Sequence, residues 1–143
     1  MLKIFFVFMV LFRSVSFAID NPDLPDYVGQ FNSRAKPFEQ NIANRAGASA
    51  AEISGLYNAY YLFLDEELNK AYNDLLKKLP KTEQKKIKAS QKSWIQFCNS
   101  ESEFIVMHWT ATRSGSSSAL SVGVYKSEII RQRIIHLLNY LKN

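Results

Sequence analysis

The residues that could do catalytic chemistry are few and far apart in this chain. Cys98 is the only cysteine, and the two histidines, His108 and His136, lie 28 positions apart. A single cysteine excludes an intrachain disulfide, and the CxxC and Cys/His spacings of zinc sites are missing. A nucleophilic pair of Cys98 with a histidine stays open, but Cys98 falls in an apolar helical stripe, where a free cysteine usually packs as a small hydrophobe.

Two polar runs also invite a catalytic interpretation. Asp65-Glu66-Glu67 supplies three carboxylates, but adjacent residues on a helix point about 100° apart and cannot converge on one substrate atom. We interpret this run as a solvated helix face. The Gly-Ser-Ser-Ser run at 115–118 lacks the preceding strand and the spacing of a nucleophile elbow or a phosphate loop, so we expect a connector there. The sequence therefore predicts a protein that is not an enzyme and holds no cofactor or metal.

The main charge feature is a cluster of lysines between Lys77 and Lys92. Such a cluster could contact phosphates or an acidic surface, or it could be a solvated helix face. Nucleic-acid binding would need a stronger basic excess or interleaved aromatic residues, so we expect no nucleic-acid partner. The formal net charge is +5, and it falls to +3 without residues 1–18, which contain Lys3 and Arg13 and no acidic residue.

Three polar residues stand within or beside apolar helical stripes. Asn69 follows Leu68, Gln91 precedes Trp94 by three residues, and Arg133 lies among isoleucines. Buried polar groups must find hydrogen-bond partners. Either these side chains bond to one another across the helices, or they line a surface that binds a partner.

The first 18 residues have the form of a secretory signal peptide. Lys3 provides a basic start, an apolar run covers 4–12, and Ser16-Phe17-Ala18 places small residues where a signal peptidase cleaves after Ala18. The apolar run is shorter than the roughly 20 residues that span a bilayer. We expect a periplasmic or secreted protein with no stable membrane anchor after cleavage. A retained anchor is the alternative, because Arg13 interrupts the end of the apolar stretch.

Helical periodicity organises most of the remaining chain. Residues 19–37 contain three prolines and no helical period, which predicts an extended or loosely ordered arm, and a short helix is expected within 38–48. Ser49 and Glu52 have the spacing of a capping box. They begin a long helix whose apolar residues recur every three or four positions until Pro80.

A second and a third helix follow. Thr82 is expected to cap a helix that continues to Trp109, and the tight connection should fold the first two long helices antiparallel. Residues 110–118 are small and polar and predict a loop, and a third helix is expected over 119–142. The fold class is therefore all-α, a small bundle with two long antiparallel helices and a third, C-terminal one. We divide the chain into 1–18, an arm at 19–48 and a helical domain at 49–143.

The helical domain contains four short motifs in order, LDEELNKAYNDLLKKL at 64–79, SQKSWIQF at 90–97, RSGSSSAL at 113–120 and YKSEIIRQRIIHLL at 125–138. With these motifs the domain resembles the LprI-like lysozyme-inhibitor family, which consists of small exported bacterial proteins. The positions that match the family pattern are Leu68, Asn69, Tyr72, Gln91, Trp94, Gly115, Ser116 and Arg133. Where the family usually has Arg-Asp after the tryptophan, this chain has Cys98 and Asn99, and it lacks the paired cysteines of many members.

The resemblance implies a non-enzymatic protein that blocks a muralytic enzyme, such as a lysozyme, by direct contact. It suggests a cysteine-poor branch of the family, with Asn69, Tyr72, Gln91, Trp94, Gly115, Ser116 and Arg133 as candidate binding positions that could equally be structural. An alternative function, drawn from the residues alone, is an envelope module that binds another protein or an anionic cell-wall polymer through the lysine-rich face.

Overall fold

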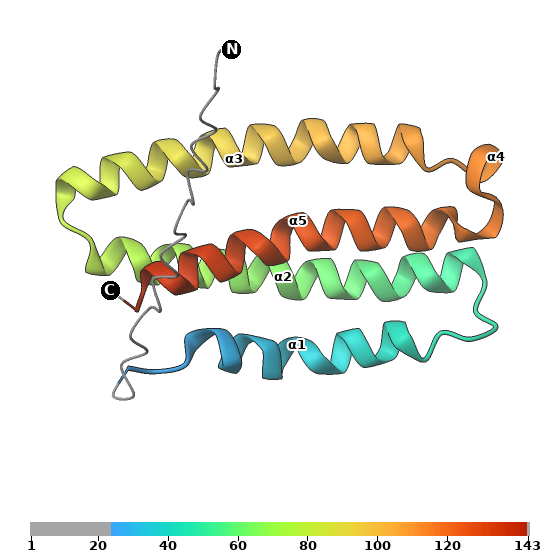
Figure 1. The fold of residues 1–143 in the computed structure, drawn as a ribbon, viewed down its shortest axis with the longest axis horizontal. Coiled ribbons are helices and arrows are strands. Elements are labelled where there is room, and N and C mark those ends of the chain that lie inside the picture. Colours follow the sequence, from blue (N-terminus) through green and yellow to red (C-terminus); the bar gives the residue numbers. More distant parts are fainter. Residues whose placement is uncertain (1–23, 143) are drawn as a thin grey trace, which may run out of the picture.

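The computed structural model describes residues 24–142, and this part of the chain contains helices and no strand. Figure 1 shows four long helices and a short helical connection before the last of them. The long helices are α1 (Tyr27–Ala43), α2 (Ala50–Lys78), α3 (Lys81–His108) and α5 (Ser118–Tyr140); the connection comprises α4 (Ala111–Ser114) and the 3-10 turn η1 (Gly115–Ser117). The prediction of a small all-α bundle is confirmed.

The first helix corrects the prediction of an extended arm over 19–37. The chain is helical from Tyr27, so the short helix expected within 38–48 is the last part of a 17-residue helix. Asp26 caps it by accepting a 2.9 Å hydrogen bond from the backbone N–H of Gly29. Phe31 and Ala35 are fully buried, because the apolar face of α1 packs on α2 and α5. This packing outweighs the low helix propensity of Pro37, which lies inside the helix.

The start of α2 confirms the capping box. The Ser49 hydroxyl accepts a hydrogen bond from the backbone N–H of Glu52, and the Glu52 carboxylate accepts one from the backbone N–H of Ser49. Two of the N–H groups that lack a partner within the helix are satisfied in this way. The helix ends at Lys78, before Pro80, as the sequence predicts.

The turn from α2 to α3 is closed differently from the prediction. We expected Thr82 to cap α3, but the helix begins at Lys81, after Pro80, and no side chain caps it. Instead, the Gln84 side-chain amide donates hydrogen bonds of 3.0 and 2.9 Å to the carbonyls of Leu76 and Leu79. Carbonyls at the end of α2 therefore find their partner on α3.

The last helix, α5, organises the bundle. Figure 1 shows that α2 and α3 run in opposite directions, as predicted, and that α5 runs parallel to α2 and antiparallel to α3. The most extensive packing joins α2 to α5, while α3 packs mainly on α5. The two long antiparallel helices are therefore not packed closely on each other along their length, because α5 forms the main contact of both.

The 110–118 segment is more ordered than the predicted loop. It forms α4 and η1, and Gly115, the first residue of η1, has a φ of +59°, a conformation that residues other than glycine rarely adopt. The Ser117 hydroxyl donates a 2.7 Å hydrogen bond to the carbonyl of Ser114. The segment turns the chain from the end of α3 into α5.

The core lies between α1, α2 and α5. Its largest fully buried side chains are Phe31, Leu64, Leu75, Ile134 and Leu137. By contrast, only Gln91 and Ile105 are buried on the 28-residue α3. Helix α3 is therefore attached to the well-packed body of α1, α2 and α5 through a seam that contains few buried side chains.

Residues 1–23 lie outside the described part of the chain, so the expected signal peptide and the start of the arm have no structural test. Within residues 24–142, no helix combines the length and the apolar character needed to cross a membrane.

Candidate functional site

A buried polar contact fastens α3 to α5. The Nε of Arg133 donates a 2.8 Å hydrogen bond to Oε1 of Gln91, and a guanidinium Nη donates a 3.2 Å bond to the Ser90 hydroxyl. The guanidinium also lies over the Trp94 ring, 5.9 Å from its centroid. Burial lowers the pKa of Arg133, and these partners compensate for the water that its charge loses.

The structure brings together some of the residues singled out by the sequence. Gln91, Trp94 and Arg133 form one cluster, whereas Tyr72 is half-buried on α2 and packs against the hydrophobic core. The hypothesis that polar residues in the stripes bond across the bundle is confirmed for Gln91 and Arg133.

The same hypothesis is wrong for Asn69. Its side-chain amide is exposed and donates hydrogen bonds of 2.9 and 3.2 Å to the backbone carbonyl and carboxylate of Asp65, on its own helix. Gly115 and Ser116 lie at the α4 end of the bundle, away from the arginine cluster and exposed to solvent. The seven candidate positions therefore do not form a single site.

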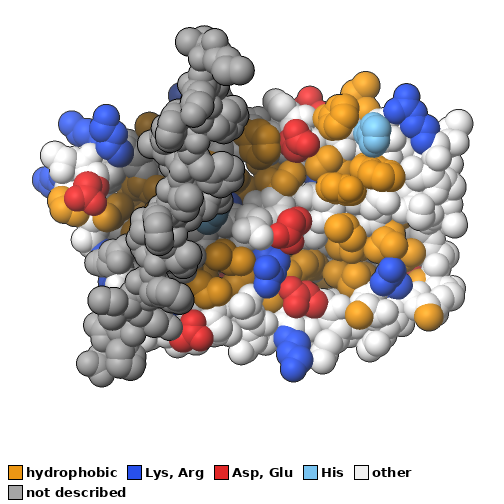
Figure 2. Space-filling model, in the orientation of Figure 1, with side chains coloured by type: hydrophobic (Ala, Val, Ile, Leu, Met, Phe, Trp, Pro, Cys, Tyr) orange, Lys and Arg blue, Asp and Glu red, His pale blue; other side chains and the backbone are white. Residues whose placement is uncertain are grey.

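Next to the arginine cluster, a groove of about 400 Å³ runs between α3 and α5. Apolar side chains from both helices line it, namely Trp94, Phe97, Ile105, Tyr125 and Ile129. Phe97 and Tyr125 remain 52% and 50% exposed. Figure 2 shows hydrophobic side chains gathered over α3 and α5 toward the α4 end, with acidic side chains among them. This is the apolar surface that the bundle leaves partly uncovered.

Stacked rings continue the groove toward the α4 end. Phe104 stacks on His108 at 5.4 Å, His108 meets the edge of Trp109 at 5.2 Å, and Trp109 stacks on Tyr125 at 5.4 Å. The series links the last turns of α3 to the first half of α5. Such ring pairs contribute about 0.5–1.5 kcal/mol each beyond the area they bury.

Sequence reasoning missed the groove residues Phe97 and Tyr125 and also Phe104, which belongs to the neighbouring series of rings. A signal was present, because Phe97, Glu101, Phe104 and His108 follow one another at steps of four, three and four on one face of α3. This face adjoins the stripe that contains Trp94, Cys98 and Ile105, and Trp94, Phe97 and Ile105 line the same groove. The two together make an apolar face wider than one neighbouring helix can cover.

The groups considered for catalysis have structural surroundings. Asp65 and Glu66 are exposed, as expected, but the interpretation of a solvated face is wrong for Glu67. Its carboxylate is buried and accepts two 2.7 Å hydrogen bonds from Arg34 on α1, which raise the pKa of Arg34. Cys98 is half-buried, and burial raises the pKa of its thiol, which disfavours the reactive thiolate. No group of three His, Cys, Asp or Glu residues in the described range could hold a metal ion.

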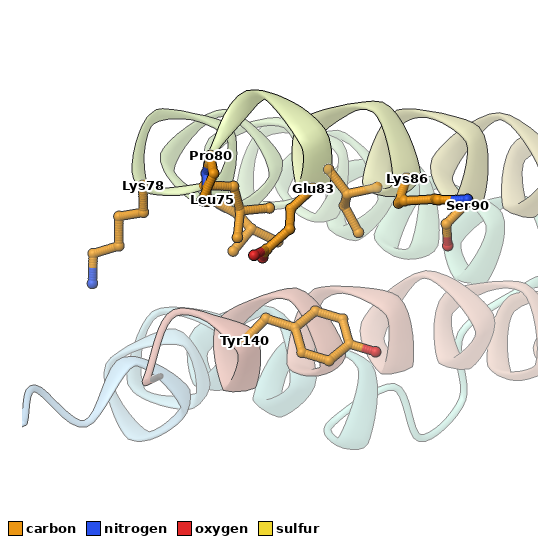
Figure 3. A pocket seen from close by; sticks show the side chains of 9 residues that line it. Leu75, Lys78, Pro80, Glu83, Lys86, Ser90 and Tyr140 are labelled. Atoms are coloured by element: carbon orange, nitrogen blue, oxygen red, sulfur yellow. The ribbon is translucent and has the colours of Figure 1, made fainter.

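The lysine-rich end contains a second cavity, of about 620 Å³, where α2, α3 and the end of α5 meet. Figure 3 shows Glu83 of α3 and Tyr140 of α5 facing the same space, with Lys78 and Lys86 at its margins. The Lys78 amine donates a 3.0 Å hydrogen bond to the Leu141 carbonyl. A carboxylate within the cavity and a lysine already bonded do not make a dedicated anion site.

The family comparison agrees with the resemblance drawn from the motifs. A model of the lysozyme inhibitor LprI family matches residues 42–137, which include α2, α3, the α4 connection and nearly all of α5. No curated protein and no solved structure is significantly similar to the chain. The match covers more than half of the 143 residues and contains both walls of the α3–α5 groove. The chain therefore belongs to the lysozyme inhibitor LprI family.

Proposed function

We propose that this protein is an exported, non-enzymatic inhibitor that blocks a lysozyme by binding it directly. The observation that carries the proposal is the family match over α2, α3 and most of α5. Proteins of this family are usually exported, in agreement with the signal peptide expected at residues 1–18. The proposed location is the periplasm or the medium.

The geometry narrows how such contact could occur. Gln91, Trp94 and Arg133 are engaged with one another, so their role in the proposal is to hold α3 in place. Recognition then depends on side chains that reach solvent. The contacts of Arg133 with Gln91 and Trp94 hold α3 against α5, and a preformed surface loses little conformational entropy on binding.

The net charge of the chain bears on how it could attract a lysozyme. Without residues 1–18 the chain has a formal charge of +3, so the molecule as a whole does not attract a basic lysozyme. Attraction must come from local carboxylates. The sequence offers Asp65, Glu66, Asp74, Glu101 and Glu103, but Asp74 already accepts a 3.0 Å hydrogen bond from Lys77.

The test is inhibition measured together with binding. The full chain is expressed with its own N-terminus, and mass spectrometry of the purified protein shows whether cleavage follows Ala18. The protein is then titrated against c-type, g-type and bacterial muralytic enzymes in a cell-wall lysis assay, with binding followed by calorimetry. Saturable one-to-one inhibition of any of these enzymes supports the proposal. Undiminished lysis by the whole panel at large molar excess would refute it.

A second candidate function rests on the lysine-rich face. Lys81, Lys85, Lys88 and Lys92 recur at steps of four, three and four, are all exposed and therefore share one side of α3. Such a stripe suits an anionic cell-wall polymer or an acidic protein. Salt-sensitive binding to purified envelope fractions that is lost when Lys85, Lys86 and Lys88 are replaced by Gln would favour it. Binding that does not respond to salt would count against it.

A further inference from the structure

Helix α3 exposes apolar surface that the other helices do not cover. Among its 28 residues only two are buried, whereas Phe97, Phe104 and Met107 are 52%, 58% and 74% exposed. Single exposed apolar side chains are common on protein surfaces, but contiguous apolar patches usually mark interaction sites. Phe97 lies in the wall of the α3–α5 groove, and Phe104 follows it on the same face, two turns further on.

The charged groups around the groove have an acidic excess. Glu101 of α3 and Glu128 of α5 line it, together with Arg133 and His136. Arg133 is buried and bonded to Gln91, so the formal charges at the surface of the groove are the carboxylates of Glu101 and Glu128. Glu128 is exposed and accepts a 2.6 Å hydrogen bond from the Gln132 side chain, which restricts its position at the rim. The groove is therefore locally acidic in a chain whose net charge is positive.

Both ends of the groove are fastened. Near the middle of α3, Gln91 and Trp94 contact Arg133 of α5; near its end, Trp109 stacks on Tyr125 of α5. These contacts set the separation of the two helices before any partner arrives. A groove with a preset width can accept one large side chain without a cost for reorganisation.

We infer that the α3–α5 groove is the surface that contacts the inhibited enzyme. It receives an apolar or aromatic side chain of a basic partner, while Glu101 and Glu128 pair with Arg or Lys residues beside that side chain. Charge complementarity is the reason for this choice of occupant, since opposite charges raise the association rate and exclude wrong partners. Central aromatic anchors such as Phe97 are expected to dominate the affinity. This inference rests on the proposed function.

The experiment compares matched variants in binding to a strongly basic c-type lysozyme. Glu101→Lys and Glu128→Lys, separately and together, reverse charge in the groove. Glu83→Lys is the control, because Glu83 is exposed on the same helix and does not line the groove. The double variant should raise the Kd by at least about tenfold, whereas the control should change it less than about threefold. The dependence of binding on salt should also weaken only in the groove variants.

A second pair of variants tests the apolar contact. Phe97→Ala should raise the Kd by about tenfold or more, while Ile95→Ala, at a 47% exposed position outside the groove lining, should have little effect. Far-ultraviolet circular dichroism and urea midpoints establish that each variant is folded. Amide hydrogen exchange provides a measurement without substitutions, and protection on binding is expected in segments 94–105 and 125–136.

The outcomes separate this inference from the proposed function. If the wild type inhibits the lysozyme and the groove variants inhibit it equally well, the groove inference is wrong and the function stands. Protection confined to the lysine-rich start of α3 would overturn it, as would inhibition of acidic muralytic enzymes alone. Sedimentation of the wild type as a dimer that the groove variants dissociate would show that a second copy occupies the groove. Failure of the wild type against the whole panel would refute the proposed function itself.

Discussion

The Nε of Arg133 in α5 lies 2.8 Å from Oε1 of Gln91 in α3, and both residues are more than 90% buried. This hydrogen bond crosses the seam where α3 has few other buried contacts. A neutral amide, rather than a carboxylate, accepts from the guanidinium. Gln91, Ser90 and the Trp94 ring therefore compensate for the water that the arginine charge loses on burial, and none of these partners is an acid.

Removing the Gln91 amide should weaken the whole fold. Gln91→Ala leaves the buried guanidinium of Arg133 without its shortest hydrogen bond, so we expect the free energy of unfolding to fall by about 2–3 kcal/mol. Urea denaturation followed by circular dichroism measures the change. Gln96→Ala, at an exposed position on the same helix, is the control and should stay within about 0.5 kcal/mol of the wild type. Equal losses in the two variants would show that the contact does not stabilise the protein.

Replacing each of two helical glycines by alanine should change the free energy of unfolding in opposite directions. A Cβ on Gly123 of α5 would clash with the Tyr57 ring of α2, so Gly123→Ala should lower the free energy of unfolding by about 1–3 kcal/mol. A Cβ on Gly55 of α2 meets no atom within 4 Å, so Gly55→Ala should raise it by up to about 1 kcal/mol through better helix propensity. Urea midpoints of the two variants decide. A stabilised Gly123→Ala would mean that α2 and α5 are not closely packed there.

The capping box predicts a pH dependence. Hydrogen bonds from the Ser49 backbone and side chain lower the pKa of Glu52 below its ordinary value of 4.5. A lowered pKa in the folded state means that the contribution to stability is present above about pH 4.5 and is lost as the pH falls through the lower folded value. The difference in urea midpoint between wild type and Glu52→Ala should therefore be largest at neutral pH and should disappear in acid.

The control for this measurement is Glu66→Ala, at an exposed position within the same helix. The difference in urea midpoint between wild type and Glu66→Ala should stay constant as the pH falls. A difference between wild type and Glu52→Ala that persists unchanged into strong acid would argue against the ionised carboxylate as the source.

The single cysteine should be slow to react and unnecessary for function. Burial raises the pKa of Cys98 above its ordinary value of 9.0, so the thiolate fraction at neutral pH is smaller than in the unfolded chain. Alkylation by iodoacetamide should be markedly slower in the native protein than in urea, as measured by mass spectrometry over time. Cys98→Ala should keep any inhibitory activity. Fast alkylation of the native protein, or loss of activity in Cys98→Ala, would support a nucleophilic role for Cys98.

Local signals in the sequence predicted the elements whose ends depend on neighbouring residues. The capping box at Ser49 and Glu52 and the stop at Pro80 involve contacts within a few residues, and both were found where expected. The periodic apolar stripes also determined the fold class, because a stripe repeating every three or four residues can be buried only by a helix packed on a neighbour. The motif order was sufficient to identify the family.

Long-range packing decided what those local signals could not. Three prolines predicted an arm, yet α1 forms because the burial of Phe31 and Ala35 against α2 and α5 offsets a poor local propensity. The same holds for Glu67, whose place in an acidic run gave no sign of its partner Arg34, 33 residues earlier.

The sequence by itself therefore determined the three longest helices, the fold class and the family. Only the tertiary structure decided that α5 contacts both α2 and α3, that Arg133 meets Gln91 and that Phe97 and Tyr125 face one groove. The physical reason is that helix formation depends on residues three or four positions apart, whereas a groove depends on how two distant helices are placed by a shared core. Such placement buries apolar area contributed by distant parts of the chain, and no local pattern encodes it.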